Sequence, residues 1–299
     1  AQGYATTGMF SVAIGAIANL ILDPVFIFVF GLGIRGAAIA TVLSQILSAA
    51  FVLYFLQKKT ELKVRLLSGE EIRDCGRRAK NIISLGTAGF IMQLTNSLVT
   101  ICCNNVLSVT GGDLYISVMT IVSSIRQIID TPIHAITEGS SPVISYNYGA
   151  RRPKRVFQSW LTMSVMAILY TLLAWGVILF APRFLIGIFS SDQALITDAI
   201  PALKLYFGAF VFQALQYVGQ TMFKSLGKKK FAIFFSLLRK VIIVVPLTYI
   251  LPYLFHMGSD GVFLAEPVSN VLGGSACFIV MLCTVMPELK RMAKENSDC

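Results

Sequence analysis

The amino-acid sequence predicts an all-α protein, a polytopic helical membrane protein whose helices cross the bilayer. Hydrophobic residues make up 56% of the chain and charged residues only 13%, whereas about a quarter of a soluble domain is charged. Apolar runs of about twenty residues recur, which is the length of helix that spans about 30 Å of hydrocarbon. Stretches such as "VIIVVPLTYI" are apolar on every side, unlike the alternating strands of a membrane barrel.

Eight apolar segments are expected to form these helices, each ended by glycine, proline or a cluster of charges. The expected helices are 7–31, 36–57, 81–108, 114–142, 156–180, 200–224, 231–254 and 260–286. The breaks between them, in chain order, are the glycine-rich turn 32–35, the charged stretch 58–80, the glycines at 109–113, the basic turn 151–155, the polar stretch 181–199, the lysine-rich turn 224–230 and the polar turn 255–260.

Basic residues are concentrated in alternate connections and in the C-terminal tail. Of the 25 lysines and arginines, eight lie in 58–80, four in 151–155, four in 224–230 and three after Met286. The other connections hold only Arg35 and Arg183. Since basic loops stay in the cytoplasm, we expect the basic connections and both chain ends there. The net charge of +10 then reflects topology and contact with anionic lipid, so no nucleic-acid partner is expected.

The six cysteines do not have the spacing of a metal site, and no C-x-x-C motif is present. We therefore expect free thiols that fill space, and no metal or other cofactor. No obligate protein partner is evident from the sequence.

An internal repeat predicts a larger architecture. "GAAIATVLSQIL" (36–47) matches "GVFLAEPVSNVL" (261–272), with Gly36 opposite Gly261, and the helix before each copy carries a proline. If the repeat is real, the chain holds eight helices of a twelve-helix transporter with two parallel, pseudo-symmetric bundles. Four helices would then precede residue 1. A chance match of small residues, which are common in membrane helices, is the alternative.

The repeat divides the chain into four expected parts, which are the last two helices of an N-terminal six-helix bundle (1–57), a cytoplasmic linker between the halves (58–80), a C-terminal six-helix bundle (81–286) and a cytoplasmic tail (287–299).

Asn19 and Asp23 lie in the middle of the first apolar segment. They are four residues apart and therefore share one face of the helix. An ionisable residue inside the bilayer is expensive and normally faces a bundle interior or a wet cavity. A functional site is one reading. The other is that Asp23 bonds backbone groups freed by Pro24.

Four ionisable residues follow one stripe of the fourth segment. Arg126, Asp130, His134 and Glu138 are spaced by four, so that Arg126 can neutralise Asp130 and His134 can bridge Asp130 and Glu138. The stripe could line a substrate cavity or relay protons, or it could be a self-satisfied ladder that fixes packing.

Glu266 stands in the second copy of the repeat where Thr41 stands in the first, five residues after the glycine. It could face a cavity or bond the backbone broken at Pro267. Arg239 and Lys240 lie inside the seventh segment. We expect either that their side chains extend toward the cytoplasm or that this helix begins later than residue 231, rather than a substrate role.

"GAIANLILDPVFIFVFGLGIRGAAIATVLSQ", "NNVLSVTGGDLYIS" and "SSPVISYNYGARRPKRV" resemble helices five to eight of the multidrug and toxin extrusion (MATE) transporters, of the bacterial MepA-like or DinF-like type. The likeness covers nearly the whole chain. It implies a cation-coupling site at Asn19, Asp23 and Thr41, with a further carboxylate from the first helix of the family. The acids that another branch of the family carries in its seventh and tenth helices are absent from 81–108 and 200–224.

At about 1.5 Å per residue, Asp23 and Thr41 both lie roughly 8–12 Å below the outer surface. Their oxygens suit Na⁺, and a desolvated Asp23 suits H⁺ instead. The resemblance thus implies an antiporter in the cell membrane that exports organic cations or lipophilic drugs by alternating access, driven by H⁺ or Na⁺. Residues 1–299 alone are expected to be inactive.

Two other functional classes remain open. Relatives of the same fold move lipid-linked sugars, and a flippase of this kind would need a larger cationic cavity than Arg126 suggests. A membrane enzyme could use Asp130, His134 and Glu138 as metal ligands, but the sequence lacks H-E-x-x-H and holds only two histidines.

Overall fold

The computed structural model describes residues 5–59 and 69–296, although the side chains of part of 69–92 lie outside this description. Every secondary-structure element in these ranges is a helix, and no strand occurs within them. The predicted all-α class is therefore confirmed. The chain separates into two compact units, Ala1–Ala79 and Lys80–Cys299, and each is described by itself.

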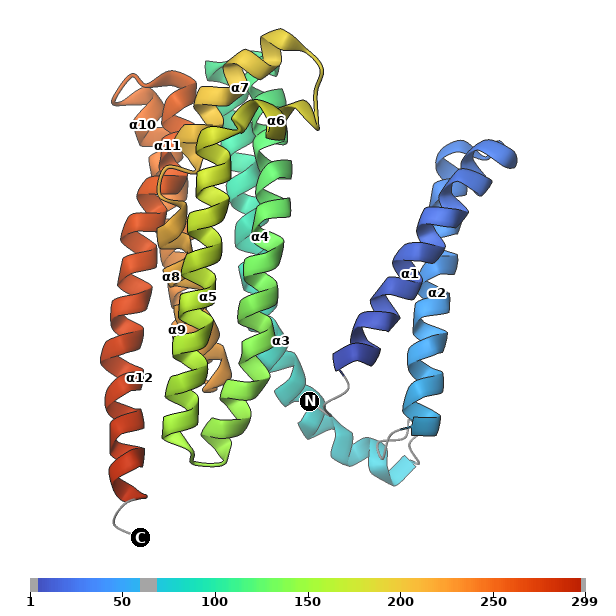
Figure 1. Ribbon diagram of the computed structural model, residues 1–299, viewed down its shortest axis with the longest axis vertical. Helices are drawn as coiled ribbons and strands as arrows, with labels where there is room; N and C mark the ends of the chain where they lie inside the picture. The colour runs from blue at the N-terminus through green and yellow to red at the C-terminus, as the bar shows by residue number, and fades with distance from the viewer. Residues whose placement is uncertain (1–4, 60–68, 297–299) are drawn as a thin grey trace. The chain divides into compact units, whose positions relative to one another are not determined.

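The first unit is a helical hairpin. Helix α1 (Ala5–Pro24) continues into a π-helical turn, η1 (Val25–Val29), and packs along α2 (Gly33–Lys59) (Figure 1). The link between them bends through Gly31 and Gly33, whose φ angles of 65° and 53° are open to glycine without strain.

The second unit is a bundle of long helices and shorter pieces that line up into broken helices. Its elements are α3 (Gly69–Thr110, which begins in the first unit), α4 (Gly112–Gly149), α5 (Pro153–Phe180), α6 (Pro182–Gly187), α7 (Gln193–Tyr206), α8 (Phe210–Ser225), α9 (Lys229–Leu237), η2 (Leu238–Val244), α10 (Val245–Tyr253), α11 (Gly258–Ser269), η3 (Asn270–Gly274) and α12 (Ser275–Glu295).

Helix α4 is central to the packing of this bundle, since it contacts α5, α7 and α8, and α8 in turn contacts α5, η3 and α12. Two apolar cores result. One gathers residues of α3, α4, α7 and α11, including Phe263 of α11, and Phe207 from the break between α7 and α8. The other lies between α5, α8 and α12 and includes Phe223 and Met281.

Several helices are broken where the sequence suggested one continuous segment. The predicted helix 200–224 is in fact α7 and α8, bent by 50° at residues 207–209. The predicted helix 231–254 contains the π-turn η2, and the predicted helix 260–286 contains η3. The expected loop 181–199 holds the short helix α6 and the first turns of α7.

By length and hydropathy, five described helices are able to cross a membrane, or six if the bent pair α7–α8 is one span. The multi-pass membrane character is thus supported. Each of the eight predicted segments coincides with a helix or a broken helix. Helix α4 is not among these helices, and it carries the ionisable stripe that begins at Arg126.

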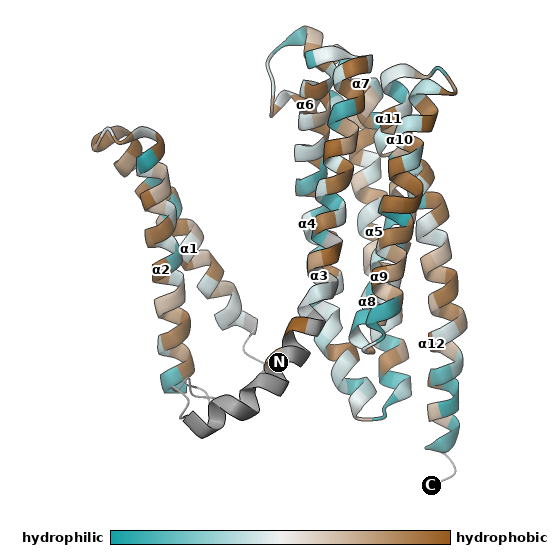
Figure 2. Ribbon diagram, turned by 180° about the vertical axis from the view of Figure 1, so that it is seen from behind, coloured by the Kyte–Doolittle hydropathy of each residue, from teal (hydrophilic) through white to brown (hydrophobic). Residues whose placement is uncertain are grey.

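The two ends of the second unit differ in charge. The turn between α4 and α5, the turn between α8 and α9, and the C-terminus lie at one end in Figure 1, whereas α6 and the α10–α11 turn lie at the other. Figure 2 shows hydrophilic residues at the C-terminal end of α12, which carries Lys290, Arg291 and Lys294. The predicted basic connections within this unit therefore share one end of the bundle.

The boundaries of two expected parts differ from the structure. Helix α12 continues to Glu295, so most of the predicted tail 287–299 is helical. Helix α3 begins at Gly69, within the predicted linker 58–80, of which residues 60–68 lie outside the described residues. The assignment of the four parts to two halves of a transporter stays a prediction.

Candidate functional site

The polar cluster of the first unit joins α1 and α2. The Nδ2 of Asn19 donates to the Oδ1 of Asp23 at 3.2 Å and lies 3.5 Å from the Oγ1 of Thr41. Asn19 and Asp23 are one helical turn apart, and Thr41 reaches the same amide from α2. The three residues expected from the family resemblance therefore do gather in space, with four oxygens of hard-ligand type on Asn19, Asp23 and Thr41.

Small residues bring these two helices close enough for that contact. A Cβ added at Gly36 would lie 2.6 Å from the backbone oxygen of Phe26, so only glycine allows this approach. Near the other end of the hairpin, the Oγ of Ser48 donates to the backbone oxygen of Ser11 at 2.7 Å. Asp23 thus sits in a hairpin whose spacing is fixed on both sides of it.

The second unit contains a cavity of about 300 Å³ among its helices. It is lined by residues of α3, α4, α7, α8, α9 and η2, namely Asn96, Val99, Thr100, Cys103, Met119, Ser123, Arg126, Asp130, His134, Tyr206, Gln216, Tyr217, Gln220, Ser236, Arg239 and Lys240. Polar side chains of several helices converge in this cavity, and convergent polar groups are what orient a ligand in a small-molecule site.

Glu266 of α11 forms ion pairs with three cationic side chains at this cavity. Its Oε1 lies 2.7 Å from an Nη of Arg126, 3.3 Å from an Nη of Arg239 and 3.2 Å from the Nζ of Lys240. The side chain of Glu266 is only 4% exposed. Burying an isolated carboxylate is prohibitive, so these cations are what allow Glu266 to stay charged inside the bundle.

Asp130 holds the other side of Arg126. The Nε of Arg126 lies 3.2 Å from the Oδ2 of Asp130, and the hydroxyl of Tyr217 donates to the same oxygen at 3.2 Å. The Nε2 of Gln213 lies 3.3 Å from both carboxylate oxygens. Arg126 also donates to the hydroxyl of Tyr206. The guanidinium of Arg126 is therefore shared between two carboxylates, Asp130 and Glu266.

The backbone of the broken helices lets Arg239 and Lys240 enter this cluster together. Both belong to the π-turn η2, and a π-turn places extra residues on one face. A Cβ added at Gly273 of η3 would lie 2.9 Å from the Cγ of Arg239, so the glycine makes room for the arginine stem. Arg239 also donates to the Oδ1 of Asn270, which belongs to η3 as Gly273 does.

The predicted extension of Arg239 and Lys240 toward the cytoplasm is wrong. Both residues are buried, with 3% and 8% of their surfaces exposed, and both line the cavity. The signal that could have located them is Glu266, because a buried acid requires cations at the same depth in neighbouring helices. Glu266 pairs with these side chains, and its bonding to the backbone at Pro267 is not what satisfies it.

The predicted stripe on α4 divides into two parts. Arg126, Asp130 and His134 line the cavity, and the predicted pair between Arg126 and Asp130 is present. Glu138 is outside the lining, and its carboxylate, with a side chain 57% exposed, pairs with Lys224 at 3.2 Å. Among the described contacts His134 does not bridge Asp130 and Glu138. Its ring lies 4.6 Å from that of Tyr217, centroid to centroid.

Metal-binding clusters are not found in the described part of the chain, where no three His, Cys, Asp or Glu side chains come together. In the same part Cys102, Cys103, Cys277 and Cys283 are free thiols. A metal centre built on Asp130, His134 and Glu138 therefore finds no support in the positions of these side chains.

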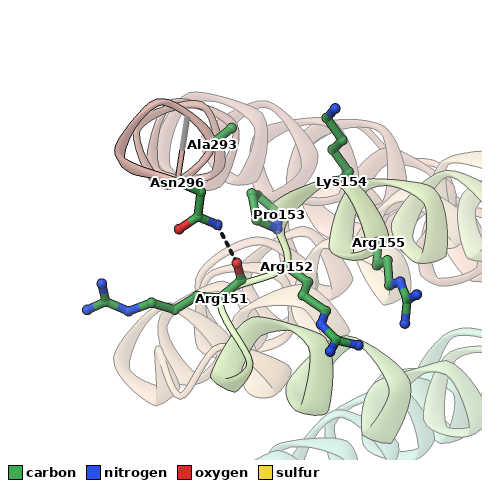
Figure 3. Close-up of a pocket in the computed structure, with 7 residues that line it drawn as sticks. All are labelled: Arg151, Arg152, Pro153, Lys154, Arg155, Ala293 and Asn296. Atoms are coloured by element: carbon green, nitrogen blue, oxygen red, sulfur yellow. Dashed lines mark hydrogen bonds between the residues drawn. The ribbon is translucent and has the colours of Figure 1, made fainter. Parts of the chain in front are cut away.

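A second pocket lies at the basic turn between α4 and α5. Its lining includes Arg151, Arg152, Lys154 and Arg155, and the Nδ2 of Asn296 donates to the backbone oxygen of Arg151 at 2.6 Å. Figure 3 shows that the basic side chains point in different directions and do not converge. The turn is a solvated basic surface, as expected of a connection between membrane helices.

Comparison with known proteins places this geometry in a family. The sequence profile of the MatE family matches residues 88–250, which is more than half of the chain and includes all of the cavity lining. The chain belongs to the MatE family. This membership confirms the resemblance to the MATE transporters noted from the sequence.

Curated relatives of this MatE chain point to the MepA-like type. It is 25% identical over 266 residues to the multidrug export protein MepA of Staphylococcus aureus (strain NCTC 8325 / PS 47), covering 88% of this chain and 57% of the relative. It is 24% identical to MepA of Staphylococcus saprophyticus, covering 91% of this chain and 59% of the relative. The MatE chain thus spans less than two thirds of the length of these relatives.

A solved structure agrees on the fold. The crystal structure of MATE in the bent conformation matches 99% of this chain and 64% of that one, with a TM-score of 0.83 and 23% sequence identity. At this identity the likeness establishes the helical MATE fold. The expectation that the chain is not an enzyme agrees with the family and with these relatives.

Proposed function

We propose that this MatE chain is part of a secondary antiporter in which Asn19, Asp23 and Thr41 bind the coupling ion. The observation that carries the proposal is the three-residue cluster, in which one amide contacts both the Asp23 carboxylate and the Thr41 hydroxyl. Asp23 lies within an apolar helix long enough to cross the bilayer. A charge there is expensive, so its retention favours an ion-binding role.

The chemistry of the cluster suits Na⁺ or H⁺. A carboxylate, an amide oxygen and a hydroxyl are hard oxygen ligands for a metal cation, and the carboxylate alone can take a proton. Either ion neutralises Asp23. The neutral site is compatible with a less hydrated environment, so ion binding can favour one conformation of the transporter over the other.

Coupling then needs only that ion and substrate each prefer one conformation. An inward ion gradient would drive an alternating-access cycle in which two halves rock about a central site. The π-turns η1, η2 and η3 interrupt three of the helices, and such interruptions are frequent at functional sites and bends.

The proposed substrates are small organic cations and lipophilic drugs, since the curated relatives are named multidrug export proteins. Arg126, Asp130, His134, Glu138 and Glu266 remain the proposed polar groups of the substrate path or proton relay. We place the protein in the cell membrane with its basic turns in the cytoplasm. Because the 266 aligned residues cover 57% of the first relative, we propose that this chain does not complete a cycle by itself.

Isosteric neutralisation of the acid tests the coupling site. The protein expressed from its own gene is assayed for gradient-driven efflux of a fluorescent organic cation in membrane vesicles. Asp23→Asn is expected to abolish gradient-driven efflux while leaving the amount of membrane-inserted protein unchanged. Gln45→Ala, an exposed polar position on α2, is the matched control and should transport normally. Efflux by Asp23→Asn at the parental rate would remove Asp23 from the mechanism.

A flippase for lipid-linked precursors is the second candidate. The gathering of Arg126, Arg239 and Lys240 at one cavity favours it, because a pyrophosphate needs cations. Two carboxylates in the same cluster oppose it. Scrambling of a fluorescent lipid pyrophosphate in proteoliposomes, compared with dye efflux, separates the two functions.

A further inference from the structure

The charges at the cavity of the second unit do not balance. Three cationic side chains, those of Arg126, Arg239 and Lys240, line it, and the carboxylates that pair with them are Asp130 and Glu266. One positive charge is therefore left over among the described residues of this cluster. Because a buried charge without a counter-charge is strongly disfavoured, an anion that enters the cavity would stabilise the cluster.

The unsatisfied groups lie at the cavity itself. Arg239 is 97% buried, as only 3% of its surface is exposed, yet its Nε has no hydrogen-bond partner. The ammonium of Lys240 has three protons, and its two hydrogen bonds are both to the single carboxylate of Glu266, at 3.2 and 3.5 Å. Buried donors of native proteins are nearly always bonded, and the exceptions are explained by strain, by a functional role, or by a bound water or ion.

The repeat gives an independent comparison. Thr41 and Glu266 occupy matching positions, five residues after Gly36 and Gly261. The helix before Gly36 carries an acid, Asp23, whereas the helix before Gly261 carries the cations of η2. With Gly36 opposite Gly261, Asp23 is opposite Thr248 and Lys240 is opposite Gly15, so the ionisable groups of the two hairpins stand at different places but have opposite net charge. A cluster with a net negative charge suits a cation, and a cluster with a net positive charge suits an anion.

We propose that the cavity of the second unit binds a small monovalent anion, either a halide or the carboxylate group of an organic molecule. One uncompensated charge matches a monovalent ligand better than a phosphate or pyrophosphate. Arg239 and Lys240 would donate the charged hydrogen bonds. Ser123, Ser236 and Gln220 line the same space and supply neutral donors. A volume of about 300 Å³ accommodates a halide or a carboxylate on a small aromatic ring.

The inference does not depend on the proposed antiport, because anion binding is measured without transport. The chain of 299 residues is purified in detergent in a gluconate buffer and dialysed to equilibrium against radiolabelled chloride or radiolabelled benzoate. Saturable binding of one ion per chain is expected for at least one of them. Binding of chloride identifies an inorganic anion, and binding of benzoate alone identifies a carboxylate ligand. Absence of saturable binding of both overturns the proposal.

Charge substitutions locate the site. Lys240→Met removes the surplus charge and should weaken anion binding by about tenfold or more, as expected for loss of a charged hydrogen bond. Lys240→Arg keeps the charge and should stay within about threefold of the parent. Lys224→Gln removes an exposed cation that pairs with Glu138 outside the cavity, and should leave binding unchanged.

A double variant separates charge balance from folding. Lys240→Met combined with Glu266→Gln restores one surplus positive charge and should recover most of the affinity lost in Lys240→Met. If Lys240→Met lost affinity because it misfolds, a second substitution would lower the affinity further. A recovery of affinity therefore reports the charge balance. Undiminished binding by Lys240→Met overturns the proposal. The proposal is also overturned if the double variant elutes as a monodisperse protein, as the parent does, and yet binds the anion no better than Lys240→Met.

Discussion

Asn19 is the residue that connects the acid of α1 to the hydroxyl of α2. Its single amide group contacts both Asp23 and Thr41. A replacement that keeps the helix but removes the amide therefore separates the two ligands. The carboxylate would remain, but without the neighbour that orients it.

Asn19→Leu is predicted to weaken coupling-ion binding by about tenfold, in line with the loss of a hydrogen bond to a charged group. The expected result is a higher half-saturating concentration of Na⁺ or H⁺ for dye efflux, with the maximal rate retained. Gln45→Ala serves again as the polar control. An unchanged ion dependence would mean that Asn19 has only a packing role.

Glu266 is predicted to be the most sensitive position for stability in the second unit. Glu266→Gln would leave Arg126, Arg239 and Lys240 close together without their shared carboxylate. Loss of one partner of a buried ion pair destabilises by about 3–5 kcal/mol. Glu138→Gln, at an exposed pair, should change stability by less than about 1 kcal/mol.

The measurement is the thermal unfolding midpoint in detergent, taken for both variants and the parent. A Glu266→Gln midpoint equal to that of Glu138→Gln would contradict the charge cluster described here.

For single residues, the sequence predicted which buried acids matter better than it predicted the cations that pair with them. Asp23, Asp130 and Glu266 stand out because each is an acid in an apolar run. The sequence predicts that Arg239 and Lys240 extend toward the cytoplasm, because long cationic side chains in a membrane helix reach toward water. Their true place depends on the π-turn η2 and on the contact with Gly273, which the hydrophobic pattern does not encode.

At the scale of elements, the two hairpins of the repeat pack by the same rule. A Cβ at Gly36 would meet the backbone of Phe26 at 2.6 Å, and one at Gly261 would meet the backbone nitrogen of Pro252 at 2.8 Å. Ala40 and Ala265 are both fully buried, and so are Ser44 and Ser269. The sequence match between 36–47 and 261–272 therefore corresponds to equivalent contacts in the two units, which favours a real repeat over a chance match.

Gly36→Ala is accordingly predicted to loosen the α1–α2 hairpin, since the added carbon would overlap backbone atoms that cannot move aside. Gly8→Ala is the matched control, because a Cβ there meets nothing within 4 Å and alanine favours helix. Hydrogen–deuterium exchange of peptides from 5–59 measures the effect. Faster exchange is expected for Gly36→Ala alone, and equal exchange in both variants would contradict the close packing.

The length of the apolar segments predicted where the helices are. It did not predict where those helices are broken. The segment predicted at 200–224 is bent by 50° at residues 207–209, with Gly208 as the only local sign of the break. The π-turn η1 follows Pro24, which cannot donate a backbone hydrogen bond. The apolar pattern therefore locates the helices but not the breaks within them.

At the scale of the whole molecule, the charge of the connections predicts orientation. Within the second unit the turns at Arg152 and Lys228 lie at the end of the C-terminus, and the α6 region lies at the other end (Figure 1). Basic turns remain in the cytoplasm. The α6 end would then face outward.

Cysteine labelling tests this orientation. In a variant with its natural cysteines replaced, Arg152→Cys should react with a membrane-impermeant maleimide only after the cells are opened, and Ser191→Cys should react in intact cells. Both positions are exposed, so access to reagent depends on the side of the membrane. The reverse pattern would contradict the assignment.

The central claim is that an acid held inside an apolar helix is retained because an ion moves through it. Proteoliposomes containing the protein expressed from its own gene test this most directly, by recording dye uptake under an imposed Na⁺ or H⁺ gradient. We predict that one gradient drives uptake, that dissipating it stops uptake, and that Asp23→Asn is insensitive to either. Uptake that persists with both gradients dissipated would contradict the claim.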